Sequence, residues 1–185
     1  MAIVDSIRDE YFRYKALAEA AIAQVTDAQL TEAPSGTDNS IAVISWHISG
    51  NLRSRFTDFL TSDLEKPWRR RDEEFTARLV SRAELLANWE DGWAVLAATL
   101  STLTDTDLDR PVTVRGQTMK AHEVLLRLLA HASYHVGQIV YVAKAFRGPD
   151  WKYLSIPPGQ SDAYNSNPVR ERASSHARAL TESKS

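Results

Sequence analysis

The sequence predicts an all-α protein: a four-helix bundle with a crossover loop, a short extended or hairpin segment before the fourth helix, and an irregular C-terminal tail. Four segments of the chain place apolar side chains at three- and four-residue steps, the period of an amphipathic helix. The 185 residues include only seven Gly and seven Pro, the residues that most disfavour helix. Four apolar stripes of this kind bury one another best in a bundle.

The first helix is predicted from about Val4 to Val25. Its stripe consists of Ile7, Tyr11, Tyr14, Ala18 and Ala21, widened by Leu17 and Ile22. Residues 26–40 are polar and turn-rich, which predicts a loop. The second helix is predicted from about Ile41 to Thr61, with Asn39 or Ser40 as its N-cap.

The third helix follows the charged connector of residues 62–75, SDLEKPWRRRDEEF. It is predicted to open at Ser81, because Glu84 three residues later completes a capping box. Apolar residues at helical spacing carry it to about Leu103. The loops after the first three helices are long for a minimal bundle, so we expect at least one of them to cross over its end.

The segment before the fourth helix has β-branched residues on both sides of Arg115-Gly116, which predicts a hairpin or an extended turn. The fourth helix should run from about Lys120 to Phe146 and stop at Gly148-Pro149. We therefore expect a bundle over residues 1–148. Residues 149–185 would form a tail that packs on the bundle and ends in a short surface helix.

Composition excludes several classes of function. The chain has no Cys, which removes disulfides, thiolate zinc sites and a cysteine nucleophile. It lacks a signal-peptide core and any stretch of about 18 apolar residues, so we expect a soluble cytoplasmic protein. A formal charge of −2 provides no global attraction for nucleic acid or an anionic membrane. We expect a small-molecule substrate rather than either of these partners.

Histidines provide the main indication of chemistry. In LAHASYHVGQIV, residues 129–140, His131 and His135 are one helical turn apart and share a face. A metal usually needs three or four ligands, and His47, between apolar neighbours in the second helix, is the candidate third. Hydrogen-bonded structural histidines are the alternative, because burying an unpaired imidazole is costly.

Three separated strings, HISGNLRSRFTDFL, EKPWRRRDEEF and LAHASYHVGQIVYVAK, resemble an uncharacterised bacterial branch of the DinB/YfiT-like superfamily. The resemblance covers roughly residues 1–160. It implies a four-helix bundle that binds a divalent metal ion through three histidines, at positions matching His47, His131 and His135. It also implies either a transferase that uses bacillithiol, mycothiol or glutathione, or a metal-dependent hydrolase.

The predicted function is accordingly a metal-dependent enzyme, a thiol-dependent S-transferase or a hydrolase, with an open three-histidine site. The alternative is a non-catalytic, stress-related bundle or homodimer in which the metal is structural or vestigial. Imidazole suits Zn, Ni and Fe alike, so the sequence does not choose the ion. A low-molecular-weight thiol would come from a cosubstrate, since the chain has no Cys.

No catalytic residue is identified by the sequence. Asp58, Asp91 and Glu123 are distant candidates for a general base. Four polar residues flank the histidines and could orient them, although each also suits ordinary packing: Ser45, Asn51, Tyr134 and Gln138.

Other aromatic and charged residues suggest both structural and binding roles. The arginines of the connector stand among acids, which favours a solvated, self-paired loop, although Arg69 or Arg71 could instead clamp an anionic substrate. We expect the substrate to enter between the open end of the bundle and the loops around Trp68 and Tyr153. The tryptophans of the predicted helices, Trp46, Trp89 and Trp93, are assigned to the core or to a dimer face. We expect His122 at the surface or in a cap-like position, and His176 in a solvated position.

Overall fold

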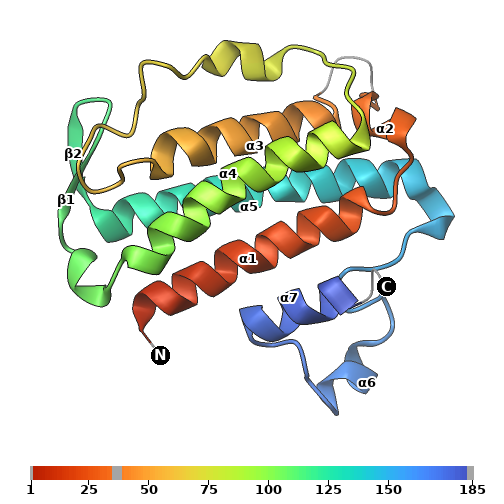
Figure 1. Cartoon of the computed structure of the whole chain (residues 1–185). Helices are drawn as coiled ribbons and strands as arrows, with labels where there is room; N and C mark the ends of the chain where they lie inside the picture. Colours follow the sequence, from red (N-terminus) through yellow and green to blue (C-terminus); the bar gives the residue numbers. More distant parts are fainter. Residues whose placement is uncertain (1, 35–38, 183–185) are drawn as a thin grey trace.

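The chain is mostly helical with one small hairpin in the computed structural model, which describes residues 2–34 and 39–182 (Figure 1). Residues 35–38 of the predicted turn-rich loop and residues 183–185 of the predicted tail lie outside the described residues. The long helices are α1 (Ile3–Ile22), α3 (Ile41–Phe56), α4 (Arg82–Thr102) and α5 (Ala121–Arg147). The shorter elements are α2 (Asp27–Thr31), α6 (Ser161–Asn165), α7 (Ala173–Glu182), β1 (Pro111–Val114), β2 (Gln117–Lys120) and the 3-10 turns η1 (Arg71–Phe75), η2 (Asp105–Asp107) and η3 (Gly148–Asp150).

The four long helices lie side by side, with α3 against α4, α1 against α5, and α3 against α5 (Figure 1). The connector between α3 and α4 returns along the outside of α3, so both helices run in the same direction (Figure 1). Its 3-10 turn η1 packs on α3. The expected long crossover is therefore this connector.

Local capping signals read from the sequence are confirmed. The Ser40 side chain accepts a hydrogen bond from the backbone N–H of Val43, and Ser81 and Glu84 form a capping box at the start of α4. The predicted second helix was too long, since α3 ends at Phe56. Asp58 has a φ of +52°, a left-handed conformation that α-helix does not tolerate.

Several short elements were missed, including η2 and α6. The predicted loop of residues 26–40 contains α2, which opens with a capping box between Thr26 and Gln29. The charged connector contains η1. A five-residue helix has too few residues to show an apolar period, so only the capping residues of α2 could have indicated it.

The hairpin before the last long helix is confirmed. β1 and β2 pair antiparallel, with Val114 opposite Gln117. Arg115 and Gly116 have φ values of +52° and +73°, as a two-residue type I′ turn requires. Asp63 of the connector accepts hydrogen bonds from the backbone N–H groups of both turn residues. The hairpin and the connector therefore brace each other.

The core fills the space between the long helices. Trp89 and Trp93 on α4 are buried, with 0% and 1% exposure, which confirms their assignment to the core; Trp46 packs against it from a partly buried position. Tyr11 of α1 is fully buried and donates a hydrogen bond to the carbonyl oxygen of Leu125 in α5. This bond ties two helices that are distant in sequence.

The C-terminal segment packs on α1. Leu180 of α7 is buried against Ala16 and Ala20. His176 lies 2.8 Å, Nε2 to oxygen, from the carbonyl of Leu154 and is half-buried. The predicted solvated position of His176 is wrong, because α7 turns this side chain towards the chain that follows α5.

Within residues 2–34 and 39–182, none of the helices combines the length and apolar character needed to cross a membrane.

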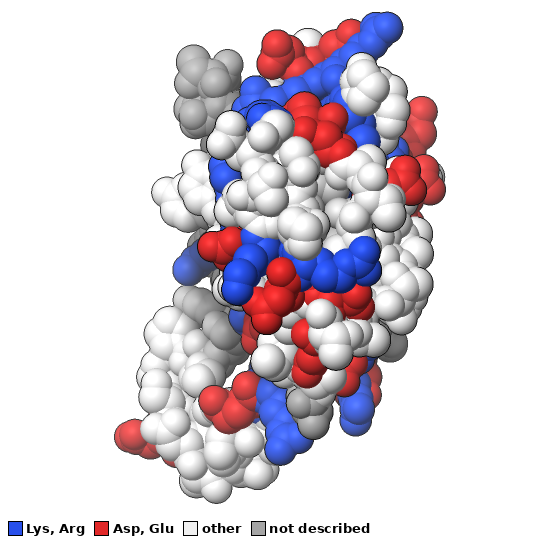
Figure 2. All heavy atoms as spheres, turned by 90° about the vertical axis from the view of Figure 1, so that its left-hand side faces the viewer, with Lys and Arg blue, Asp and Glu red and all other residues white. Residues whose placement is uncertain are grey.

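The end of the molecule that carries the hairpin shows basic and acidic side chains interspersed (Figure 2). Charge on this face is therefore mixed rather than gathered into one area of a single sign.

Candidate metal centre

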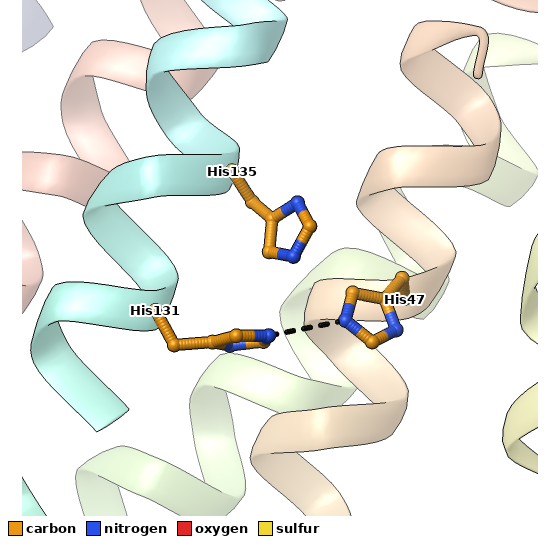
Figure 3. Close-up of side chains that lie close together, drawn as sticks. All are labelled: His47, His131 and His135. Carbon is orange, nitrogen blue, oxygen red and sulfur yellow. Dashed lines mark hydrogen bonds between the residues drawn. The ribbon is translucent and has the colours of Figure 1, made fainter. Parts of the chain in front are cut away.

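His47, His131 and His135 converge from two helices. Each histidine offers one ligand nitrogen, and these atoms lie within 4.8 Å of one another. The Nε2 atoms of His47 and His131 are 3.2 Å apart. Figure 3 shows the three rings turned towards a common point from α3 and α5. The structure thus brings together the three histidines that the sequence proposed as a group.

α5 positions two of the histidines by its own geometry. His131 and His135 are four residues apart, so their side chains leave the same face one turn apart. Their ring centroids are 4.6 Å apart. This face is directed at α3, since α3 and α5 pack together. A regular helix is therefore enough to create this half of the site.

His47 needs support from outside its own helix. Its ring is buried, and its Nδ1 lies 2.8 Å from Oε2 of Glu74 in η1. Arg69 donates from Nε to Glu74 Oε1 and from Nη2 to Oε2, both at 2.8 Å. The buried carboxylate therefore bridges a histidine and a guanidinium, with a bidentate bond to the latter.

Gly50 makes room for this carboxylate. It lies one turn after His47 in α3, and a Cβ placed on it would come within 2.7 Å of the Glu74 carboxyl carbon. Because Arg69 and His47 both hold Glu74, its carboxylate could not yield without breaking those bonds. A side chain at position 50 would therefore disturb the support of His47.

His135 has a neutral orienting partner. Its Nδ1 lies 2.7 Å from Oε1 of Gln138 on the next turn of α5. Gln138 was one of the flanking residues proposed to orient a ligand, and this contact agrees with that interpretation. An oxygen facing Nδ1 places the proton there and leaves Nε2 with a free lone pair.

Aromatic rings border the histidines on both helices. The ring of Phe75, the last residue of η1, is 4.5 Å from that of His47. The Tyr134 ring is 4.9 Å from that of His135, and this tyrosine is 63% exposed. The cluster is therefore covered by the connector on the α3 side and reaches the surface beside Tyr134.

Burial keeps the imidazoles of α5 neutral. Burial, reinforced by His135 and His47, lowers the pKa of His131 to about 3. Burial also lowers the pKa of His135, although its hydrogen bond to Gln138 opposes the shift. At neutral pH both imidazoles are therefore uncharged, and each has one nitrogen without a proton, the form that binds a metal ion.

Glu74 remains a carboxylate despite its burial. Burial alone would raise the pKa of Glu74, but hydrogen bonds from His47 and Arg69 and the charge of Arg69 outweigh it and hold the pKa below its usual value. A full negative charge next to Nδ1 of His47 favours a proton on that nitrogen and leaves Nε2 to face the other two histidines.

Other candidates from the sequence lie away from the cluster. Asp58 and Asp91 are exposed, and Glu123 accepts a hydrogen bond from the backbone N–H of Lys120 at the start of α5. His122 approaches the carbonyl of Leu108, which agrees with its predicted cap-like position. None of these belongs to the three-histidine group found among the described residues.

The remaining α3 candidates are packing residues. Ser45 and Asn51 are buried, and within residues 2–34 and 39–182 neither side chain has a hydrogen bond to the histidines. The Ser45 hydroxyl has no partner there at all. Of the four flanking residues, Gln138 lies within hydrogen-bond distance of His135, and the Tyr134 ring contacts the ring of the same histidine.

One interpretation of the connector needs correction. It is self-paired as expected, but it is not a wholly solvated loop, since the Arg69 and Glu74 side chains are only 2% and 9% exposed. The predicted entrance between the open end of the bundle and the loops around Trp68 and Tyr153 stays a prediction, and these two residues line different pockets. Tyr153 lies beside α7, whereas Trp68 lies beside α3.

Glu74 and Gly50 are the supporting residues that the sequence analysis missed. Glu74 was counted among the acids that neutralise the arginines, and its contact with a histidine 27 residues away had no local signal. A glycine in the interior of a predicted helix was the available clue, because glycine is costly there without a packing reason.

Comparison with known proteins identifies a family over most of the chain. No curated protein and no solved structure matches the sequence. A family model described as "Protein of unknown function (DUF1572)" matches residues 1–160, which include all three histidines, Glu74 and Gln138. The chain belongs to this family.

Proposed function

We propose that this protein binds a divalent metal ion through His47, His131 and His135 and uses it as a metal-dependent enzyme acting on a small molecule. The observation that carries the proposal is the convergence of three ligand nitrogens within 4.8 Å. Hydrogen-bonded structural histidines do not require three rings to meet at one point. A shared ion explains why they do.

The residues fit a metal ion in both spacing and lone-pair direction. The 3.2 Å between the Nε2 atoms of His47 and His131 is close to the roughly 3.3 Å that separates neighbouring ligands around tetrahedral zinc with Zn–N bonds of 2.0–2.1 Å. Glu74 and Gln138 occupy the Nδ1 positions of His47 and His135. Both histidines are thereby oriented to offer Nε2.

The number of ligands favours chemistry over a structural role. Within the described ranges, no carboxylate or additional histidine joins the three, whereas structural zinc sites are usually closed by four protein ligands. A bound divalent ion with three imidazole ligands would supply Lewis-acid chemistry at its remaining positions. Glu74 and Gln138 position the imidazoles, and the Phe75 ring beside His47 limits the access of water to the cluster. The side next to the exposed Tyr134 stays open to a substrate.

The arrangement of the long helices supports a DinB/YfiT-like four-helix bundle as the fold. α3 supplies one histidine and α5 supplies two, in the order that the resemblance implies. We propose on this basis a thiol-dependent S-transferase or a hydrolase. Zn, Ni and Fe all accept imidazole ligands and are all candidates.

The test begins with metal-free protein reloaded separately with Zn, Ni and Fe. Each form is assayed with low-molecular-weight thiols plus electrophiles, and in parallel with ester and amide substrates. Metal-dependent turnover of either group, lost on chelation, is the expected result. Stoichiometric metal that raises the melting temperature without any turnover would support the structural alternative instead.

A further inference from the structure

A second pocket lies on the far side of His47 from the candidate metal centre. It is formed between α3 and the connector, with a volume of about 340 Å³, at the small end of the range for ligand sites. Glu74, which binds Nδ1 of His47, is part of its wall. The pocket is therefore separate from the point where the Nε2 atoms converge, with the His47 ring and Glu74 between them.

Positive charge exceeds negative charge in this pocket. Four arginines line it against two glutamates. Arg69 is committed to Glu74, and Arg70 pairs with Glu73 at 3.1 Å. These pairs neutralise one another, so the positive charges of the other two arginines, Arg53 and Arg78, remain in excess.

Arg53 and Arg78 have donors to spare. In the described part of the chain, the Arg53 guanidinium makes no hydrogen bond or ion pair, although it is half-buried. Arg78 donates from Nη2 to the carbonyl oxygen of Glu73, but its Nε is buried with no partner. An arginine that keeps donors without an acceptor is well suited to bind a carboxylate or phosphate group.

Two tryptophans add aromatic surface. The Arg78 guanidinium lies over the Trp46 ring, 4.6 Å from its centre, which fixes its position. Trp68 is 55% exposed although it is a large apolar side chain. An exposed tryptophan in the same pocket as these arginines provides a flat face on which a planar ring can stack.

We propose that this pocket binds a small aromatic oxyanion, with its carboxylate or phosphate on Arg53 and Arg78 and its ring against Trp68. The site does not depend on the proposed metal function, because Arg53, Arg78 and Trp68 are not among the three converging histidines. Its ligand would approach the Arg69–Glu74 pair and could act as a second substrate or an effector.

The experiment is calorimetric titration of the full chain, metal-free and metal-loaded, with phenyl phosphate, benzoate and inorganic phosphate. We expect saturable one-to-one binding of phenyl phosphate or benzoate in both forms; the tighter of the two identifies the oxyanion. Inorganic phosphate should bind about 10-fold more weakly, because it lacks the ring.

Substitutions locate the binding. Arg53→Gln and Arg78→Gln should each weaken it by about 10- to 100-fold, the range for a lost hydrogen bond to a charged group. Trp68→Ala should weaken the aromatic probes but not inorganic phosphate. Arg127→Gln is the matched control: it removes the same charge from an exposed position on α5 outside the pocket and should change nothing. Melting curves verify that each variant is folded.

Absence of saturable binding by both aromatic probes would overturn the proposal. So would an equal loss of affinity in Arg127→Gln, since the attraction would then be nonspecific. Equal affinity for inorganic phosphate and phenyl phosphate would overturn the proposal that the ring of the ligand packs against Trp68. Metal content is measured on the same samples, so failure of this pocket is distinguishable from failure of the metal centre.

Discussion

The two halves of the histidine cluster are held in different ways. On α5, His131 and His135 are placed by one helical turn, and His135 is oriented by the neutral amide of Gln138, three positions away. On α3, His47 depends on a buried carboxylate and guanidinium contributed by the connector. The two histidines of α5 are therefore positioned by local helix geometry, whereas His47 of α3 is positioned by ionic contacts with residues distant in sequence.

This difference has an energetic consequence. A buried ion pair is costly to break because one charge is left without its partner, whereas a neutral hydrogen bond on a helix surface contributes modestly. Changes in the support of the α3 half should therefore reduce both metal affinity and folding stability. Changes in the support of the α5 half should affect metal affinity with little effect on folding.

The largest effect is expected from removing a ligand. His135→Ala should lower zinc affinity by more than the roughly 10- to 100-fold typical of an orienting partner, because a coordinating nitrogen itself is lost. Metal analysis after dialysis measures the remaining occupancy. His122→Ala, a change outside the cluster, should retain full occupancy. If His135→Ala kept stoichiometric metal, the three-histidine assignment would be untenable.

Glu74→Gln tests the ionic support of the α3 half. It leaves the Arg69 side chain buried without a counter-charge, so the free energy of unfolding should fall by about 3 kcal/mol, with metal affinity about 10- to 100-fold lower. Urea unfolding and zinc titration measure the two quantities.

Glu90→Gln is the control for this change, because its carboxylate pairs with Lys15 while remaining 58% exposed. Such a pair contributes about 0–1 kcal/mol. Similar stability losses in Glu74→Gln and Glu90→Gln would show that the buried pair has no special role.

A glycine-to-alanine change should lower the free energy of unfolding on α3 and raise it on α5. Gly50→Ala would push the Glu74 carboxyl group away from His47 and Arg69, with a loss of about 1–3 kcal/mol expected for overpacking. A Cβ at Gly137, an exposed position in α5, would meet no atom within 4 Å. Gly137→Ala should therefore stabilise the helix by about 0.5–1 kcal/mol.

Thermal or urea unfolding of these two variants gives the comparison directly. If Gly50→Ala were as stable as the unmodified protein and bound zinc equally well, close packing between α3 and Glu74 would not be needed for the site.

The smallest effect is expected for Gln138→Ala. Loss of the acceptor at His135 Nδ1 should weaken zinc binding by about 10-fold, the lower limit for an orienting partner. The free energy of unfolding, measured with urea, should stay within about 0.5 kcal/mol of that of the unmodified protein. If Gln138→Ala lost more zinc affinity than Glu74→Gln, the α5 half would depend more on its orienting partner than the α3 half, which contradicts the proposed difference.

Local features of the fold were predictable to the extent that they depend on neighbouring residues. The Ser81–Glu84 capping box, the Arg115-Gly116 turn and the stop at Gly148 follow from side chains or backbone preferences within a few positions. The end of α3 was misplaced because apolar spacing continues through Phe59, although the backbone turns at Asp58. Periodicity alone does not register such a turn.

The sequence by itself determined four long amphipathic helices and the pairing of His131 with His135, because a helix brings side chains four positions apart to one face. Only the tertiary structure decided that Glu74 supports His47, that Arg69 is buried with it, and that Arg53 and Arg78 share a pocket with Trp68. These contacts depend on the path of the α3–α4 connector over α3. That path is determined by packing over many residues and leaves no short-range pattern in the chain.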